Sequence, residues 1–126
     1  MKAAVYPGAG KPLVLEDLPD PEPGPDDVVI AMRRCGICGT DLHMTEGHPW
    51  QFAPGTVPGH EYAGEVVAVG AKVTGIRTGD LITALPSTGC GQCEACHRGN
   101  LALCHNAPGV MGGFAEFVRI PASVAV

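Results

Sequence analysis

Short runs of hydrophobic residues, each ended by glycine, proline or polar residues, recur along the chain. Runs of this kind that are bounded by turn residues are typical of β-strands. The segment Pro19–Pro25 cannot pair regularly, because proline donates no backbone hydrogen bond, and we expect an extended connector there. We predict strands at Lys2–Tyr6, Leu13–Glu16, Val28–Arg33, Glu65–Val69, Leu81–Leu85 and Phe114–Ile120.

One segment has a helical rather than a strand pattern. Residues Thr40–Glu46 fit one or two helical turns after the break that Gly36–Gly39 makes. Thr40 or Asp41 would be a suitable N-cap, because a side-chain oxygen at that position accepts a free backbone N–H. We therefore predict a short helix whose first residues carry polar side chains.

The segment Gly47–Gly59 is rich in proline and aromatic residues and is predicted to be a loop. Its aromatic residues Trp50 and Phe52 either line the entrance of a pocket or pack inside the protein, and the sequence leaves both alternatives open. A turn is predicted at Thr74–Asp80, between two of the strands.

Together these elements predict one mostly β domain. A chain of 126 residues is long enough to enclose its own core. Its 18 glycines and 12 prolines favour short strands and many turns over long helices, and such strands indicate a barrel or a sandwich. The sequence has no β-α-β alternation and no glycine-rich phosphate-binding fingerprint, so we expect no nucleotide site of the usual kinds in it.

The charge and the hydrophobic runs exclude several classes of partner. The net charge is −5 and the basic residues are scattered, which argues against binding of nucleic acid. No apolar run approaches the roughly 18 residues of a membrane span, and no secretory signal is visible at the start. We expect a cytoplasmic protein without a membrane partner. In that reducing compartment clustered cysteines are metal ligands or catalytic groups before they are disulfides.

Residues 86–108 break all periodicity and contain four of the six cysteines, spaced C-x2-C-x2-C-x7-C. Four thiolates this close can form a closed tetrahedral shell around one Zn²⁺, which predicts a structural zinc site. An iron–sulfur cluster fits less well, since the last spacing is seven and no proline follows. Disulfides between cysteines so close in sequence would be strained. His97 and His105 are expected at the surface, because the cysteines suffice: Cys90, Cys93, Cys96 and Cys104.

A second candidate group lies outside this lobe. Cys38 and His60 are suitable for part of a catalytic zinc shell, which keeps one position open. From residue type alone, an isolated cysteine and an isolated histidine are more often a buried apolar residue and a surface imidazole. Cys35 and Cys38 form a C-x-x-C without the β-α-β context of a redox motif. His60-Glu61 begins like the metalloprotease motif H-E-x-x-H, but Gly64 occupies the second histidine position.

Four segments in order resemble the zinc-containing alcohol dehydrogenases of the medium-chain dehydrogenase/reductase superfamily. Gly36–His43 is similar to the segment around their catalytic zinc, and Pro58–Gly70 to their Gly-His-Glu segment. Cys90–Cys104 resembles their structural-zinc loop, and Gly112–Phe117 the strand that follows. These motifs cover nearly the whole chain. The resemblance implies that residues 1–126 form a GroES-like, partly open β-barrel with a zinc lobe at residues 86–108.

The resemblance also implies the ligands of a catalytic zinc. Cys38 and His60 would bind it, and Glu61 would lie beside the metal and replace water as a ligand during turnover. Asp41 would hydrogen-bond the ring of His60, which fixes the tautomer of a ligating imidazole. The family supplies a third permanent ligand, usually Cys, Asp or Glu, from beyond Val126.

Two further residues acquire roles in proton transfer through the resemblance. Thr40 would accept the proton of the substrate hydroxyl, and His43 would pass it to solvent, since an imidazole titrates near neutral pH. Two alternatives stay open: Thr40 and Asp41 serve only as helix caps, and His43 is a solvated surface residue.

The implied activity is oxidation of a small alcohol or polyol, with hydride transfer to NAD or NADP. A Rossmann domain would bind that cofactor. Because the family continues beyond Val126, we expect this chain to be a fragment that is inactive alone, from a homo-oligomeric enzyme. The sequence does not identify the alcohol. Two other hypotheses are a non-catalytic zinc-binding β-barrel module and a redox or metal-storage protein that uses Cys35 and Cys38.

Overall fold

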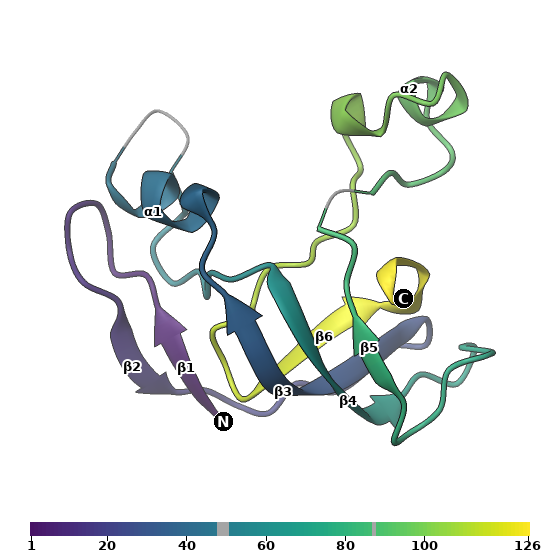
Figure 1. The fold of residues 1–126 in the computed structure, drawn as a ribbon, viewed down its shortest axis with the longest axis horizontal. Helices are drawn as coiled ribbons and strands as arrows, with labels where there is room; N and C mark the ends of the chain where they lie inside the picture. Colours follow the sequence, from purple (N-terminus) through teal and green to yellow (C-terminus); the bar gives the residue numbers. More distant parts are fainter. Residues whose placement is uncertain (48–50, 87) are drawn as a thin grey trace.

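The computed structural model describes residues 1–47, 51–86 and 88–126. Two antiparallel sheets form the body (Figure 1). A hairpin pairs β1 (Lys2–Val5) with β2 (Val14–Asp17). The larger sheet has the strand order β5-β4-β3-β6, and its members are β3 (Asp27–Gly36), β4 (Glu61–Val69), β5 (Leu81–Thr83) and β6 (Phe117–Pro121).

The central strands β3 and β4 are longer than the hydrophobic pattern predicted. The prediction ended the first of them at Arg33 and began the second at Glu65. In the structure the pairing continues to Gly36 opposite Glu61. Backbone hydrogen bonds extend the ladder through residues such as Arg34 and Gly36, whose side chains do not indicate a strand. The two ligand-bearing segments therefore leave the same end of one ladder.

The last two strands are shorter than predicted. Ala84 forms only an isolated bridge with Ala125, so β5 ends at Thr83. Residues 114 and 115 pair with the hairpin: Ala115 bridges Ala3, and the N–H of Ala4 donates to the carbonyl of Phe114. Glu116 lies between the two sheets, since its N–H donates to the carbonyl of Lys2 and its carbonyl accepts the N–H of Met32 on β3. These bridges join the larger sheet to the hairpin at one end and to the C-terminal residues at the other, which gives a partly open barrel.

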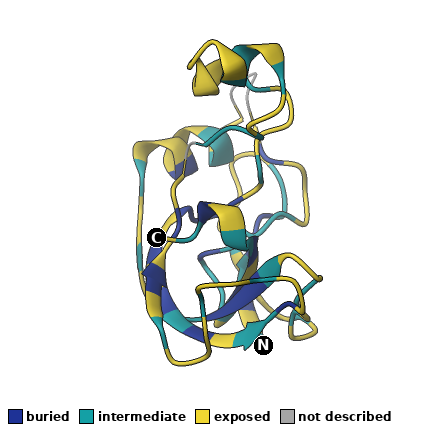
Figure 2. Ribbon diagram, turned by 90° about the vertical axis from the view of Figure 1, so that its right-hand side faces the viewer, coloured by how far each residue is buried: buried dark blue, intermediate teal, exposed yellow. Residues whose placement is uncertain are grey.

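The core lies against one face of the larger sheet, because buried residues alternate with more exposed ones along β4 and β6. Figure 2 shows the buried segments. Register shifts in the β3–β4 ladder bend the sheet around this core. The 3₁₀ turn η2 (Ala122–Val124) closes it near the C-terminus. The mostly β prediction is confirmed. The buried cluster consists of Val28, Ile30, Tyr62, Val66, Ile82, Ala84, Val110, Val118, Ile120 and Val124.

Helix α1 (Gly39–Thr45) begins at the end of β3, with Cys38 as its N-cap. The prediction that Thr40 or Asp41 occupies the N-cap position is wrong. Asp41 is the third residue of the helix, and its Oδ2 accepts the backbone N–H of Cys38 at 3.0 Å. The helix thus starts earlier than expected, and Asp41 in its first turn bonds the backbone of the N-cap residue.

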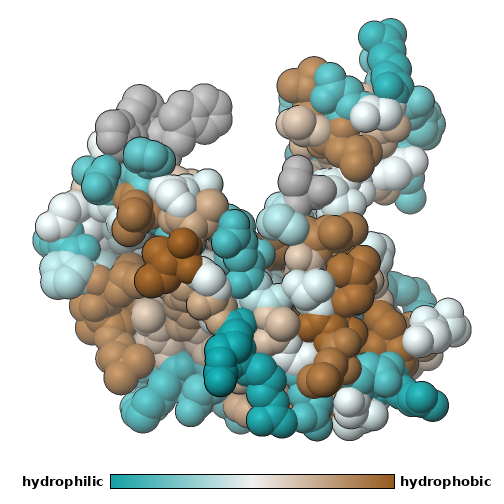
Figure 3. Space-filling view, viewed as in Figure 1, coloured by the Kyte–Doolittle hydropathy of each residue, from teal (hydrophilic) through white to brown (hydrophobic). Residues whose placement is uncertain are grey.

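The cysteine-rich lobe projects from the body (Figures 1 and 3). It contains α2 (Glu94–His97) and the 3₁₀ turn η1 (Leu101–Leu103), and none of its described residues belongs to the core cluster. In the described part of the chain, no helix has the length and apolar character needed to cross a membrane.

Phe52 packs inside the protein. It is buried and contacts Tyr6 edge-on, with ring centroids 6.0 Å apart. Of the two alternatives for this aromatic, the structure therefore shows packing. Trp50 lies outside the described residues.

Candidate metal centres

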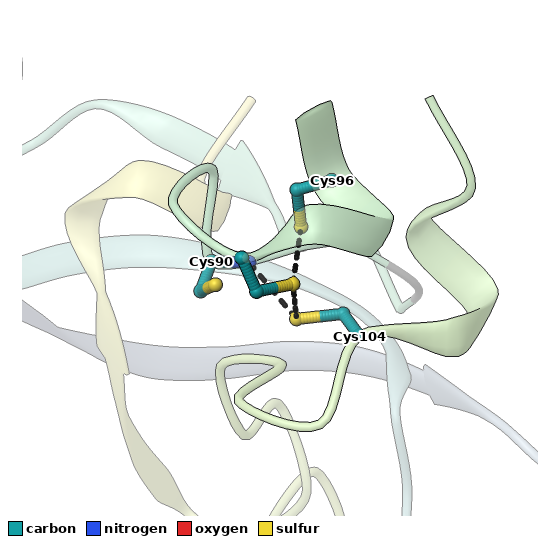
Figure 4. A group of neighbouring side chains, drawn as sticks. Cys90, Cys96 and Cys104 are labelled. Carbon is teal, nitrogen blue, oxygen red and sulfur yellow. Dashed lines mark hydrogen bonds between the residues drawn. The ribbon is translucent and has the colours of Figure 1, made fainter. Parts of the chain in front are cut away.

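The four cysteines of the lobe form one group. Figure 4 labels three of them, Cys90, Cys96 and Cys104. All four sulfurs lie within 4.8 Å of one another. The Sγ of Cys93 is 3.5 Å from that of Cys96 and 3.8 Å from that of Cys104. Sulfurs about 2.3 Å from a tetrahedral zinc are separated by about 3.8 Å. A disulfide would require about 2.05 Å, and all six cysteines are free. The spacing therefore fits a single tetrahedral ion.

Local backbone structure brings these thiols together. Gly91 and Gly99 have φ angles of +74° and +75°, which favour glycine, and both lie at turns between ligands. Gly89 has no room for a side chain, because a Cβ would contact the Cys96 sulfur. His97 and His105 are exposed and do not belong to the four-cysteine group.

The thiols of the lobe are not equivalent in acidity. Backbone N–H groups of Gln92 and Cys93 donate to the sulfur of Cys90 and lower its pKa to about 6. The N–H of Cys96 likewise lowers the pKa of Cys93. Burial raises the pKa of Cys96 to about 11. A thiolate accordingly forms most readily at Cys90, where a cation would find a ligand already deprotonated.

A second group combines a thiol, an imidazole and a carboxylate. The ligand atoms of Cys38, His60 and Glu61 all lie within 4.8 Å of one another. Cys38 caps α1, and Glu61 starts β4 opposite Gly36. A Cβ on Gly36 would lie 3.2 Å from the Glu61 Oε2, so this glycine gives the carboxylate room.

Asp41 links the two segments that carry these ligands. Its side chain is buried, and its two oxygens accept the backbone N–H of Cys38 at 3.0 Å and that of Gly59 at 3.1 Å. Its Oδ1 is also 3.4 Å from Nδ1 of His60. That Nδ1 is buried and makes no hydrogen bond to the described residues. Asp41 therefore lies next to the imidazole nitrogen, without the hydrogen bond that the resemblance implied.

Thr40 and His43 occupy successive turns of α1. The Oγ1 of Thr40 is 3.7 Å from the Sγ of Cys38, so this hydroxyl lies beside the second group. His43 has a side chain 75% exposed, and its Nδ1 is 4.0 Å from a carboxylate oxygen of Glu46. The structure thus places Thr40 at the group and His43 at the solvent boundary.

Cys35 is not a member of the ligand group among the described residues. Its sulfur packs against two glycines: a Cβ on Gly59 would lie 3.0 Å from it, and one on Gly113 2.7 Å from it. Burial raises the pKa of its thiol. The structure thus shows a packed strand residue, which matches its interpretation as a small side chain on a strand.

Gly64 likewise has no room for a histidine. A Cβ there would contact the backbone oxygen of Ala31 on the neighbouring strand and lie 2.5 Å from the side chain of Ile30. The metalloprotease motif is therefore excluded by packing as well as by sequence.

One component of this region was not predicted from the sequence. Residues 110–114, which follow the lobe, hydrogen-bond to residues on both sides of His60: two of their N–H groups donate to the carbonyl of Gly59, and the hydroxyl of Tyr62 donates to the carbonyl of Val110. Burial raises the pKa of Tyr62, so its hydroxyl remains a donor at neutral pH. The only local signal was the adjacent pair Gly112-Gly113, which marks a close backbone approach.

Residues 24–126 match the family described as alcohol dehydrogenase GroES-like domain. The chain belongs to this family. The resemblance identified from the motifs is confirmed, and the partly open barrel is the GroES-like fold.

Relatives of this domain are dehydrogenases. L-threonine 3-dehydrogenase of Saccharopolyspora erythraea is 43% identical, over 96% of this chain and 37% of the relative. A protein described as a zinc-binding dehydrogenase of Sinorhizobium meliloti, solved with NADP, is 40% identical over 99% of this chain and 37% of its own, with a TM-score of 0.87. A thermostable alcohol dehydrogenase of Pyrobaculum aerophilum, solved with cobalt and zinc, is 32% identical over 100% of this chain and 40% of its own, with a TM-score of 0.88. The chain spans well under half the length of these proteins.

Proposed function

We propose that this chain is the zinc-binding catalytic domain of a dehydrogenase that oxidises a small alcohol with NAD or NADP. The observation that carries the proposal is that this chain, a member of the alcohol dehydrogenase family, contains two separate groups of metal ligands. One has four thiols suited to a closed structural shell, and the other has the mixed donors Cys38, His60 and Glu61. The nicotinamide would be bound by a Rossmann domain elsewhere in the whole protein, as the greater length of the relatives allows.

The donors of the second group fit a catalytic zinc. Thiolate, imidazole and carboxylate are the three zinc ligands of proteins. Because Nδ1 of His60 faces Asp41, we assign Nε2 as its ligand atom. Cys38 and His60 would be permanent ligands. The exposed Glu61 would be the exchangeable one, with a further ligand supplied by the whole protein.

When bound, zinc supplies a Lewis acid that lowers the pKa of a substrate hydroxyl, and the nicotinamide accepts the hydride. The chain's own residues handle the proton. Thr40 lies beside Cys38 and would act as a relay, its Oγ1 accepting the substrate hydroxyl proton as it passes its own proton on. His43, exposed on the next turn of the helix, would take up the relayed proton and release it to water.

The names of the relatives guide the choice of substrate. The threonine dehydrogenases among them favour a β-hydroxy amino acid as the first alcohol to test, with simple alcohols and polyols next. The free cysteines suit the cytoplasm, where we place the whole, homo-oligomeric enzyme.

The test is the zinc content of the purified chain and of two single variants. We expect two zinc ions per chain, falling to one in Cys38→Ser and to one in Cys104→Ser, because each variant removes a ligand of a different group. In the whole protein, Cys38→Ser should abolish alcohol-dependent reduction of the nicotinamide. Equal zinc in wild type and Cys38→Ser would instead support a zinc-binding module without a catalytic metal.

A further inference from the structure

Residues 110–114, which we call the return segment, follow the cysteine lobe and support the turn that carries His60. Backbone N–H groups of Gly112 and Gly113 both donate to the carbonyl of Gly59, at 3.1 and 3.0 Å. The N–H of Phe114 donates to the carbonyl of Pro58 at 3.0 Å. The residues just before His60 are therefore held by three hydrogen bonds from one segment.

The residues just after His60 are held by the same segment through one side chain. Tyr62 is 3% exposed, and its hydroxyl donates to the carbonyl of Val110 at 2.9 Å. Val110 is itself part of the core. His60 and Glu61 thus lie between two attachments to residues 110–114, one by backbone and one by the tyrosine hydroxyl.

Close packing leaves little room for the return segment and the His60 turn to move relative to each other. A Cβ on Gly113 would lie 2.6 Å from the Tyr62 ring and 2.7 Å from the Cys35 sulfur. A Cβ on Gly59 would lie 2.7 Å from the ring of Phe114. Because packed interiors respond to shifts of a few tenths of an ångström, movement of the return segment is transmitted to the His60 turn.

We propose that Tyr62 is a positioning residue for the Cys38–His60–Glu61 metal group, acting through its hydroxyl bond to the return segment. The inference rests on the proposed function, since it presupposes a metal at that group. Without the hydroxyl, the buried carbonyl of Val110 loses its partner, and the start of β4 loses its side-chain link to residues 110–114. Backbone pairing and the Thr83 hydroxyl, which donates to the carbonyl of Tyr62 at 2.6 Å, would remain. The ligands would then sample a wider range of separations and release the metal faster.

The experiment compares Tyr62→Phe with Tyr6→Phe in the zinc-loaded protein. Tyr6 is an internal control, because it is equally buried and its hydroxyl has no hydrogen-bond partner among the described residues. Zinc release to excess chelator is followed per chain, and the kinetic phase that is missing in Cys38→Ser is assigned to the mixed-ligand group. We expect Tyr62→Phe to accelerate that phase about tenfold, with the phase from the lobe unchanged. Tyr6→Phe should leave both phases unchanged.

Two further measurements separate positioning from general stability. Ile120→Val removes one methylene from the core on β6, and should lower the melting temperature without changing the zinc release rate. With Co²⁺ as the bound ion, Tyr62→Phe should alter the visible absorption spectrum, which reports ligand geometry, whereas Ile120→Val should not. Equal acceleration by both variants would overturn the proposal, because release would then follow stability.

The positioning role of Tyr62 and the proposed function are overturned by different results. A wild-type release rate and spectrum in Tyr62→Phe, with the Cys38-dependent zinc present, would overturn the positioning role alone. If Cys38→Ser removed no kinetic phase, the proposed function would fail and the positioning role with it.

Discussion

Asp41 and His60 lie side by side in the interior, with 3.4 Å between Oδ1 of the carboxylate and Nδ1 of the imidazole. The Asp41 carboxylate also accepts the backbone N–H groups of Cys38 and Gly59. One buried side chain therefore fixes the separation between the segment that carries the thiol and the segment that carries the imidazole. That separation decides whether the two can share a metal ion.

Replacement of this carboxylate should weaken metal binding at the mixed-ligand group. Both oxygens of Asp41 accept a backbone N–H, so in Asp41→Asn the amide NH₂, a donor, would face one of these donors and leave it without an acceptor. The negative charge beside His60 would also be lost. We expect zinc affinity at this group to fall about 10- to 100-fold, measured by competition with a chelator. Asp80→Asn is the matched control, since that carboxylate accepts a backbone N–H in the turn before β5. Equal losses in both variants would contradict the role of Asp41.

The turn before His60 should tolerate no side chain. Gly59 has a φ of +90°, and a Cβ there would lie 2.7 Å from the ring of Phe114. We expect Gly59→Ala to lower the free energy of unfolding by about 1 to 3 kcal/mol, through strain and the displaced ring. Urea unfolding measures this. Gly109→Ala should have little effect, because no heavy atom lies within 4 Å of its added Cβ. A stable Gly59→Ala protein would show that the loop can move aside.

The lobe should lose its metal without loss of the barrel. Cys104→Ser removes one of four thiolates, so zinc content should fall by one per chain, as measured by elemental analysis. The core contains no described residue of the lobe, so strand content by circular dichroism should be retained. His105→Gln changes the adjacent exposed residue and should keep full zinc. Loss of zinc in His105→Gln would show that the imidazole contributes to the shell.

The strands were predictable because valine and isoleucine mark them, as in Val28–Arg33 and Leu81–Leu85. Their ends were not, because pairing at Gly36 and Glu61 depends on the partner strand and not on side-chain type. The helix start was misplaced for a related reason: a cysteine is an uncommon N-cap.

The two metal groups differ in the same way. The lobe follows from local spacing, since its four cysteines lie within one short segment. The grouping of Cys38 with His60 had only weak support from residue type and became specific through the resemblance, because the residues are distant in sequence. The contact of Tyr62 with Val110 could not be predicted from the sequence, since nothing in the spacing of the two residues indicates that their segments meet.

The proton path should be separable from metal binding in the whole protein. Thr40 lies beside Cys38 while His43 is exposed on the next turn, so the first should be required and the second replaceable by water. We expect Thr40→Ala to lower the rate of hydride transfer about a hundredfold or more. Thr40→Ser keeps the hydroxyl and should retain most of the rate.

His43→Gln should cause a smaller loss, which added imidazole buffer restores, because a soluble base can reach the exposed position. Zinc content has to stay constant across the three variants, so that changes in rate report proton transfer alone. Rates are followed by the absorbance of the reduced nicotinamide. A Thr40→Ala enzyme with full zinc and a wild-type rate would show that the hydroxyl proton leaves by another route, and Thr40 would then be a residue of the helix start only.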